Sequence, residues 1–184
     1  MEWNRFSMSA LRLIKQIEVT NGVSTVNIDN VFSADFDIYK ITSHSVSSTA
    51  SISDVLVRLI NSSGSAITSS VYDWAYLRSQ YGGTQSESRS TNNNHTRLYG
   101  VSYDNPEGTS GMGYIFNPYS SSSYTFFTAQ NHSIWNNENS LEQRKYIAVN
   151  KSFVSCTGLQ LYLVSGAFGT GTVFRIYGLR VDNG

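Results

Sequence analysis

Three histidines could bind a metal or transfer protons, but their spacing favours neither role. His44, His95 and His132 lie far apart in the chain, and none has a cysteine or a second histidine within a few residues. Zinc sites usually draw their ligands from close pairs of histidine and cysteine. His95 and His132 border polar stretches, where a solvated imidazole is the ordinary state. We therefore predict no metal site and no cofactor.

Carboxylates and nucleophiles also form no catalytic pattern. Glycoside hydrolysis needs two carboxylates about 5 to 9.5 Å apart. Asp35 and Asp37 share one strand face and other acidic residues lie in or near loops, but no pair stands out, because acidic residues at strand ends are usually solvated. No G-x-S-x-G elbow occurs, and Gly82-Gly83 is not followed by the lysine of a phosphate-binding loop. The sequence thus predicts a protein that is not an enzyme.

Short neutral side chains supply most of the polarity of this chain. Its 184 residues, enough for one domain, include 30 Ser, 14 Thr and 16 Asn, and only 14% are charged, against about 25% in an ordinary domain. Such side chains hydrogen-bond to the local backbone and disfavour helix interiors. The 12 Tyr and 9 Phe suit pleated surfaces. The composition therefore indicates an all-β protein.

Charge and hydropathy argue against two classes of partner. The 13 basic and 13 acidic residues cancel, and no basic stripe could neutralise phosphates, so we expect no nucleic-acid binding. No run approaches about 18 apolar residues, and the N-terminus lacks the apolar core of a signal peptide, so we expect no membrane span and folding in a cytoplasm. Cys156 is the sole cysteine and is predicted to be a small buried side chain.

The chain divides into a short N-terminal arm, residues 1–10, and a single domain, residues 11–184. The arm carries Trp3, Phe6 and Met8 and is too short to form a core of its own. It is either a frayed terminus or an arm that docks on a neighbour, and these three residues are then the candidate assembly contacts.

Alternating apolar and polar residues begin at Leu11 and recur in short runs, the first two separated by Asn21-Gly22, a strong hairpin signal. About ten such runs with turn signals between them predict an antiparallel β-sandwich or barrel. One of them, 71–81, could also form a helical turn. The runs are 11–20, 23–28, 31–46, 51–60, 71–81, 95–104, 111–118, 123–130, 145–154, 157–166 and 172–181.

Two polar stretches, 82–94 and 131–144, are predicted to be exposed loops. Ser140–Gln143 fits a capping box, so at most one short helix is expected there. Aromatic rings stack on sugars and amides bond their hydroxyls, so these loops supply the candidate glycan contacts. These are Tyr81, Asn93, Trp135, Asn136 and Asn137. Trp74 and Tyr76 are interpreted as core aromatics instead.

The last run, TVFRIYGL, has apolar residues on both faces, as a strand covered on both sides would. Gly178 follows Tyr177 and would permit a bulge or a close approach of another group. We predict that this strand lies beside the one that begins at Leu11 and closes the domain.

The segments at the two ends resemble a recurrent pattern in virion structural proteins of tailed bacteriophages, particularly marine and cyanobacterial ones. The resemblance lies in LRLIKQIEVTNGV, in FSADFDIYKI (32–41), in GYIFNP (113–118) and in the closing Tyr177-Gly178-Leu179. It covers most of the chain by the order of segments, and the two polar stretches depart from it.

The resemblance implies a jelly-roll-like β-sandwich on the outer surface of a phage particle, often as a homotrimer. The leading hypothesis is a capsid decoration or cement protein that bridges subunits of the major capsid protein. The alternative is a tail or head-fibre appendage that binds a host surface glycan through the polar loops. A polysaccharide-degrading enzyme is a third hypothesis.

Overall fold

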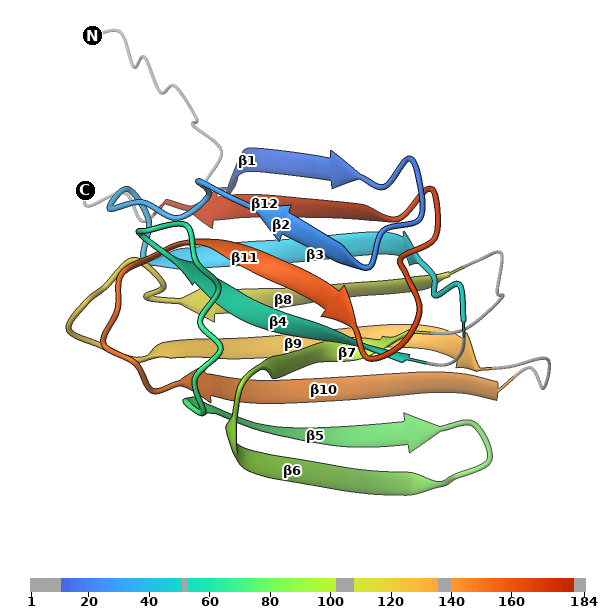
Figure 1. Cartoon of the computed structure of the whole chain (residues 1–184). Coiled ribbons are helices and arrows are strands. Elements are labelled where there is room, and N and C mark those ends of the chain that lie inside the picture. The colour runs from blue at the N-terminus through green and yellow to red at the C-terminus, as the bar shows by residue number, and fades with distance from the viewer. Residues whose placement is uncertain (1–10, 51–52, 102–107, 136–139, 181–184) are drawn as a thin grey trace, which may run out of the picture.

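The computed structural model describes residues 11–50, 53–101, 108–135 and 140–180, and the regular structure in these ranges is entirely β (Figure 1). It confirms the predicted all-β class. The twelve strands are β1 (Leu11–Glu18), β2 (Thr25–Ile28), β3 (Ile38–Val46), β4 (Ser53–Asn61), β5 (Tyr72–Gln80), β6 (Gln85–Asn93), β7 (Thr96–Val101), β8 (Thr109–Phe116), β9 (Thr125–Trp135), β10 (Ser140–Asn150), β11 (Cys156–Leu163) and β12 (Val173–Leu179).

The strands form two antiparallel sheets of unequal size that pack face to face. The large sheet has eight strands in the order β1-β12-β3-β8-β9-β10-β5-β6, and the small sheet has four in the order β2-β11-β4-β7. In Figure 1 the small sheet lies in front of the large one, and β5 and β6 extend the large sheet below it. The candidate arm residues Trp3, Phe6 and Met8 lie outside the described residues.

The connectivity is that of a jelly roll with two inserted hairpins. When β5–β6 and β9–β10 are set aside, the remaining eight strands, renumbered along the chain, follow the orders 1-8-3-6 and 2-7-4-5. These two interleaved four-stranded sheets define a jelly roll. The hairpins pair with each other through β10 and β5 and with the roll through β9 and β8. The predicted jelly-roll-like sandwich is therefore confirmed, with a large sheet twice as wide as the small one.

The predicted neighbours of the last strand are also confirmed. β12 pairs with β1 on one side, from Leu11 opposite Leu179 to Glu18 opposite Val173, and with β3 on the other. A Cβ added at Gly178 would lie 2.6 Å from ring atoms of Phe36. Glycine is required here because a buried aromatic ring packs directly on the strand.

Both stretches predicted to be loops contain strands, and the segment that fits a capping box forms a strand instead of a short helix. Residues 85–93 form β6, β9 continues to Trp135, and the capping-box segment from Ser140 begins β10. β6 is an edge strand with polar side chains on both faces, a common protection against unwanted pairing. In β9 and β10 the inward positions include Asn131, Glu142 and Arg144, which are buried. Polar residues on the core side hid the alternation from sequence analysis.

We expect Gly178→Ala to lower the free energy of unfolding by about 1 to 3 kcal/mol, because the added methyl group would displace the ring of Phe36 from a close-packed site. Denaturant unfolding measures this change. Gly22→Ala is the control, since its added Cβ would meet no atom closer than 3.6 Å and should change stability by less than about 0.5 kcal/mol. Equal losses in both variants would contradict the packing argument.

Candidate functional site

The outer face of the large sheet carries a group of apolar side chains toward one end and a row of polar side chains farther along the strands. Strand register places side chains from β3, β8, β9 and β10 side by side in rows across this face. Six of them form what we call the apolar half: Ile38, Tyr114, Phe116, Phe126, Ile147 and Val149. Phe126 is 49% exposed and Ile147 is 62% exposed. A contiguous exposed apolar patch of this kind marks a surface that contacts another molecule.

Exposed aromatic rings continue this patch around the end of the sheet. Tyr124, just before β9, and Phe153, just after β10, are in contact with their rings tilted by 33° and the centroids 4.8 Å apart, and Phe153 is 59% exposed. Tyr119 lies in the neighbouring turn and is also exposed. The apolar half and these rings form one surface with aromatic character.

The polar half lies farther along the same strands. His132 of β9 is opposite Ser110 of β8 and Gln143 of β10, and Gln143 is opposite Ser79 of β5. We define the polar half by its row across the sheet: His44, Ser110, His132, Gln143, Ser79 and Gln85.

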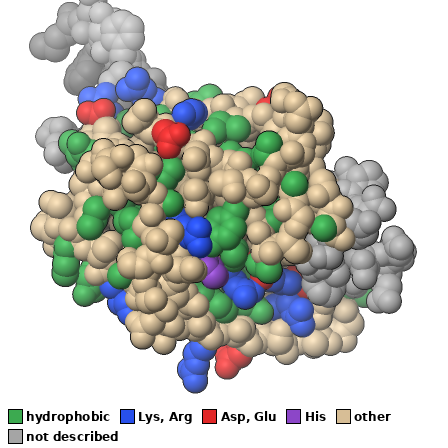
Figure 2. Space-filling view, in the orientation of Figure 1, with side chains coloured by type: hydrophobic (Ala, Val, Ile, Leu, Met, Phe, Trp, Pro, Cys, Tyr) green, Lys and Arg blue, Asp and Glu red, His purple; other side chains and the backbone are tan. Residues whose placement is uncertain are grey.

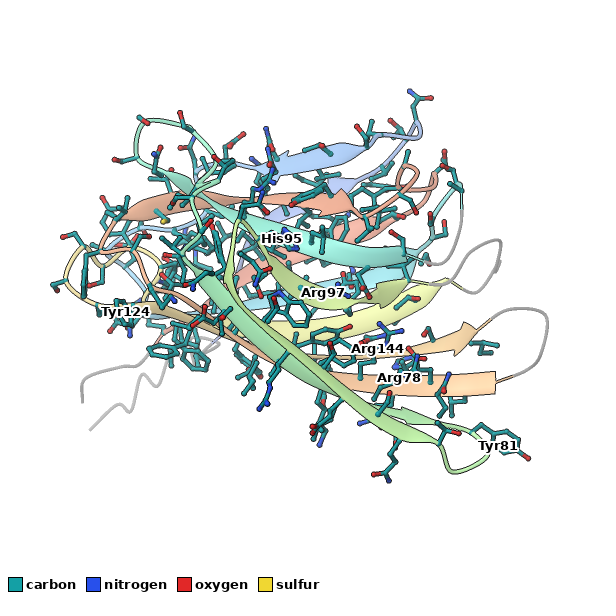
Figure 3. All side chains as sticks on the ribbon, turned by 60° about the horizontal axis from the view of Figure 1, so that its bottom comes forward. Arg78, Tyr81, His95, Arg97, Tyr124 and Arg144 are labelled. Atoms are coloured by element: carbon teal, nitrogen blue, oxygen red, sulfur yellow. The ribbon has the colours of Figure 1, made fainter. Side chains whose placement is uncertain are left out.

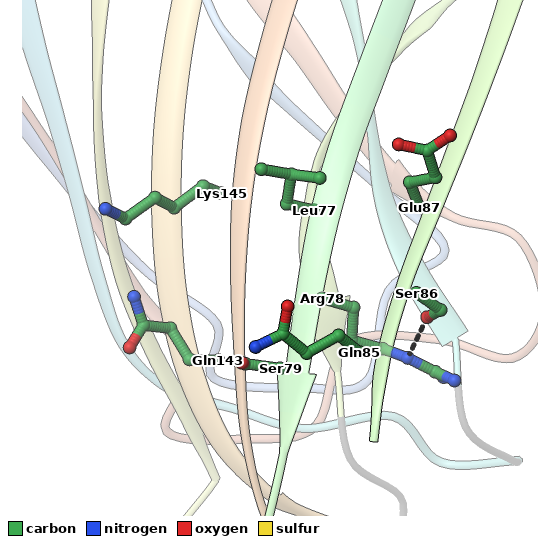
Figure 4. Close-up of a pocket in the computed structure, with 8 residues that line it drawn as sticks. All are labelled: Leu77, Arg78, Ser79, Gln85, Ser86, Glu87, Gln143 and Lys145. Atoms are coloured by element: carbon green, nitrogen blue, oxygen red, sulfur yellow. Dashed lines mark hydrogen bonds between the residues drawn. The ribbon is translucent and has the colours of Figure 1, made fainter. Parts of the chain in front are cut away.

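Two adjoining hollows sink into the polar half and share Gln143. One, of about 450 Å³, lies between His44 and His132. The other, of about 440 Å³, is drawn in Figure 4, where side chains from β10, β5 and β6 surround it. Behind it, Arg78 Nε donates a hydrogen bond of 2.9 Å to Ser86 Oγ.

A buried ion-pair network connects the inner faces of the two sheets. Arg144 of β10 donates from Nη1 to Asp54 of β4 at 2.8 Å, and Arg97 of β7 also donates to Asp54. Arg144 Nε bonds Glu142, and Arg78 Nη1 lies 3.7 Å from the same carboxylate. Figure 3 shows Arg97, Arg144 and Arg78 along this inner side. The carboxylates are thus occupied by arginine, in a role that binds sheet to sheet.

Two aromatic rings support the network, as core aromatics rather than as a sugar platform. Trp74 and Tyr76 stack with ring centroids 6.1 Å apart. Arg97 lies over the Trp74 ring at 4.5 Å and Arg144 over the Tyr76 ring at 5.5 Å. Trp74 is buried and Tyr76 packs against the core, which confirms the interpretation of both.

The position of Arg144 depends on a glycine and on its neighbours. Burial lowers the pKa of Arg144, and Tyr146, Glu142 and Asp54 raise it by more, so the pKa lies above its ordinary value and the group stays charged. A Cβ added at Gly100 would lie 2.7 Å from Cζ of Arg144. Only glycine leaves space at this position for the guanidinium.

The side covered by the small sheet is mostly neutral. Figure 2 shows tan surface with a small group of blue side chains beside one histidine. Arg58 lies over the Tyr162 ring at 4.6 Å, and His95 approaches the same ring edge-on at 6.2 Å. Burial, with added repulsion from Arg58 and Arg97, lowers the pKa of His95 below its ordinary value.

The two candidate glycan residues whose side chains the structure describes, Tyr81 and Asn93, lie at opposite ends of the β5–β6 hairpin. Tyr81 is 80% exposed, and its backbone N–H bonds Leu141 O at 2.8 Å, beside the end of the sheet that Trp135 reaches. Asn93 lies at the far end of β6, opposite Tyr72, and its amide donates to Tyr72 O at 3.4 Å. Asn136 and Asn137 lie outside the described residues, as does the side chain of Trp135.

Sequence reasoning missed the outer face because its members are scattered over six strands. The periodicity of each strand was the available signal, but only register aligns His44 with His132 or Phe116 with Phe126.

The described residues include no candidate metal site, and the thiol is buried. The described ranges contain no cluster of three or more His, Cys, Asp or Glu side chains that could hold a metal ion. No helix in the described part of the chain is long and apolar enough to cross a membrane. Cys156 is buried as predicted, and burial raises the pKa of its thiol to about 12.

Comparisons with known proteins give no family. No family model matches the sequence, and no curated protein matches it. One similar solved structure is a fructofuranosidase from Schwanniomyces occidentalis in complex with fructosylnystose, at 6% identity and a TM-score of 0.22. The match covers 86% of this chain and 35% of that one, so the chain spans about a third of the enzyme's length. A likeness this weak carries no argument about activity.

We expect Asp54→Ala to lower the free energy of unfolding by about 3 to 5 kcal/mol, because it leaves the buried Arg144 guanidinium without its partner across the sandwich. Urea unfolding measures the loss. The control is Asp73→Ala, which removes a partly exposed ion pair of 3.0 Å with Lys151 and the hydrogen bond of 2.8 Å that Asp73 accepts from the Asn92 N–H, and should cost only about 1 to 2 kcal/mol. If both variants lose the same stability, the network does not connect the sheets as described.

The lowered pKa of His95 predicts that stability falls in mild acid. The unfolded chain, with an imidazole pKa near about 6.5, takes up a proton more readily than the folded chain. The contribution of the neutral His95 side chain to the free energy of unfolding is fully present above about pH 6.5. It is lost as the pH falls through the pKa that His95 has in the folded chain. Thermal melts between neutral and acidic pH should show a smaller decline for His95→Gln than for the unaltered protein. An unchanged slope in that variant would exclude His95 as the cause.

Proposed function

We propose that this protein is a non-enzymatic structural component of a bacteriophage particle, a capsid decoration protein that bridges coat subunits from outside. The proposal combines the resemblance of the end segments to phage virion proteins with one observation of the structure. That observation is the apolar half of the large sheet, which exposes apolar and aromatic side chains from four adjacent strands.

The apolar half suits attachment because binding there would be driven by burial of apolar surface and not by charge. Burying a side chain such as Phe126 or Ile147 contributes about 1.5 to 3 kcal/mol. The chain has a formal net charge of zero, so long-range repulsion between neighbouring copies is weak. In a homotrimer, three such faces would bind together, and avidity would multiply a modest single contact.

The jelly-roll connectivity supports the same role. Two sheets joined by an internal ion-pair network leave the wide outer face of the eight-stranded sheet available for contact. The partner in this proposal is the major capsid protein, and the location is the outer surface of the head, after assembly in the host cytoplasm.

The first experiment counts the copies of this protein in purified phage particles. The second measures how tightly the purified protein binds to particles that lack it. Quantitative mass spectrometry should find many copies per particle, in proportion to the coat protein. Particles that lack the chain should bind added purified protein, and the double variant Phe126→Ser/Ile147→Ser should bind about a hundredfold more weakly.

A control and a contrary result complete this test. Val164→Ser removes an apolar side chain that is 59% exposed but lies after β11, away from the apolar half, and should bind normally. Circular dichroism and melting temperature check that each variant is folded. Absence of the chain from purified particles, or full binding by the double variant, would overturn the proposal.

A further inference from the structure

We propose that the polar half of the large sheet is a binding track for an anionic polysaccharide, with the negatively charged sugar seated between His44 and His132. This site is separate from the apolar half, because Phe126 and His132 are six residues apart on β9, about 20 Å along the strand. The inference does not depend on whether the protein lies on the head or on the tail.

The first hollow has the groups that an acidic sugar requires. His44, His132 and Arg175 line it together with the amide side chains of Gln130 and Gln143. Its size, about 450 Å³, is within the range of small-ligand sites. Imidazole, guanidinium and amide groups all donate hydrogen bonds, and donors to a charged oxygen form the stronger class of hydrogen bond.

The charge of this hollow selects for anions. Its titratable lining residues, as far as the described ranges extend, are two histidines and one arginine, with no carboxylate among them. Arg175 is held in position by a hydrogen bond of 2.7 Å from its Nε to Gln16 Oε1, and a guanidinium has further N–H donors that suit carboxylate or phosphate. A neutral sugar would not use this charge.

The local backbone is shaped around His44. The pairing of β3 with β8 shifts between Ser43 and Val46, and Ser45 adopts a φ of 54°. A bulge redirects side chains, and a serine with positive φ is uncommon. A Cβ at Gly108, whose φ is 62°, would lie 2.7 Å from the backbone of Ser45. Strand β3 is therefore irregular beside the hollow, and Gly108 leaves the space that this irregularity requires.

The track is long enough for a chain of sugars rather than for one ring. Its row crosses six neighbouring strands, from β3 to β6, and at about 4.8 Å between strands this spans about 24 Å. Beyond Gln143 the second hollow offers the neutral Ser79 and Gln85, together with the charged Glu87 and Lys145. Because only the first hollow combines cationic groups with a lining free of carboxylates, the anionic group is placed at the histidine end, and further sugars lie along the rest.

Affinity electrophoresis and calorimetry at physiological salt test this assignment with three probes. These are polygalacturonate, which carries carboxylates, a phosphomannan, which carries phosphates, and dextran, which is neutral. We expect binding to one or both anionic polymers and none to dextran, and the comparison of the two identifies the acid that the hollow accepts.

Variants then locate the site. His132→Ala/Gln143→Ala should weaken binding about tenfold or more, since each loses a hydrogen bond to the ligand. Thr128→Ala, an exposed position on the same strand and face but outside both hollows, should bind normally. Equal binding to dextran, no binding to either anionic polymer, or full binding by the double variant would each overturn the proposal, and melting curves confirm that the variants are folded.

Discussion

The bond from Arg144 to Asp54 is the interaction on which the rest of this structure depends. It links the large sheet to the small one at 2.8 Å, in a region where both sheets present polar side chains inward. Removing water from two charges is costly unless each finds partners, and Glu142, Arg97 and Tyr146 complete the set. Gly100 provides the space for the guanidinium. Charge pairing here replaces the apolar contacts that the opposite end of the sandwich uses.

The ion pairs between the sheets allow the large sheet to extend beyond the cover of the small one. A four-stranded sheet cannot cover all eight strands of its partner, and the inserted hairpins β5–β6 and β9–β10 lie where cover is thinnest (Figure 1). β7 is the strand of the small sheet nearest to them, and its Arg97 reaches both Asp54 and the Trp74 ring. The hairpins are therefore anchored by polar and cation–π contacts in addition to the apolar packing of residues such as Phe127 and Tyr146, while their outer side chains remain available to other molecules.

Sequence analysis could predict the class, the jelly-roll connectivity implied by resemblance, and the pairing of β12 with β1, because apolar alternation is strong there. It could not find β6 or the adjoining ends of β9 and β10, since Asn131, Glu142 and Arg144 occupy positions where alternation leads one to expect apolar residues. Tyr81, one of the candidate glycan contacts, is 80% exposed. The outer face was unpredictable, because the residues that meet there are brought together only by strand register.

The polar edge strand β6 affects whether copies of this chain can pair edge to edge. An edge with free backbone groups is a template, and sheets that expose one can add subunit after subunit without limit. β6 alternates serine with Gln85, Glu87 and Arg89, so an incoming strand would find charge and no apolar side chains to cover. Lateral addition at this edge of the sheet is thereby disfavoured relative to contacts through a face, which can end in a closed assembly of fixed size.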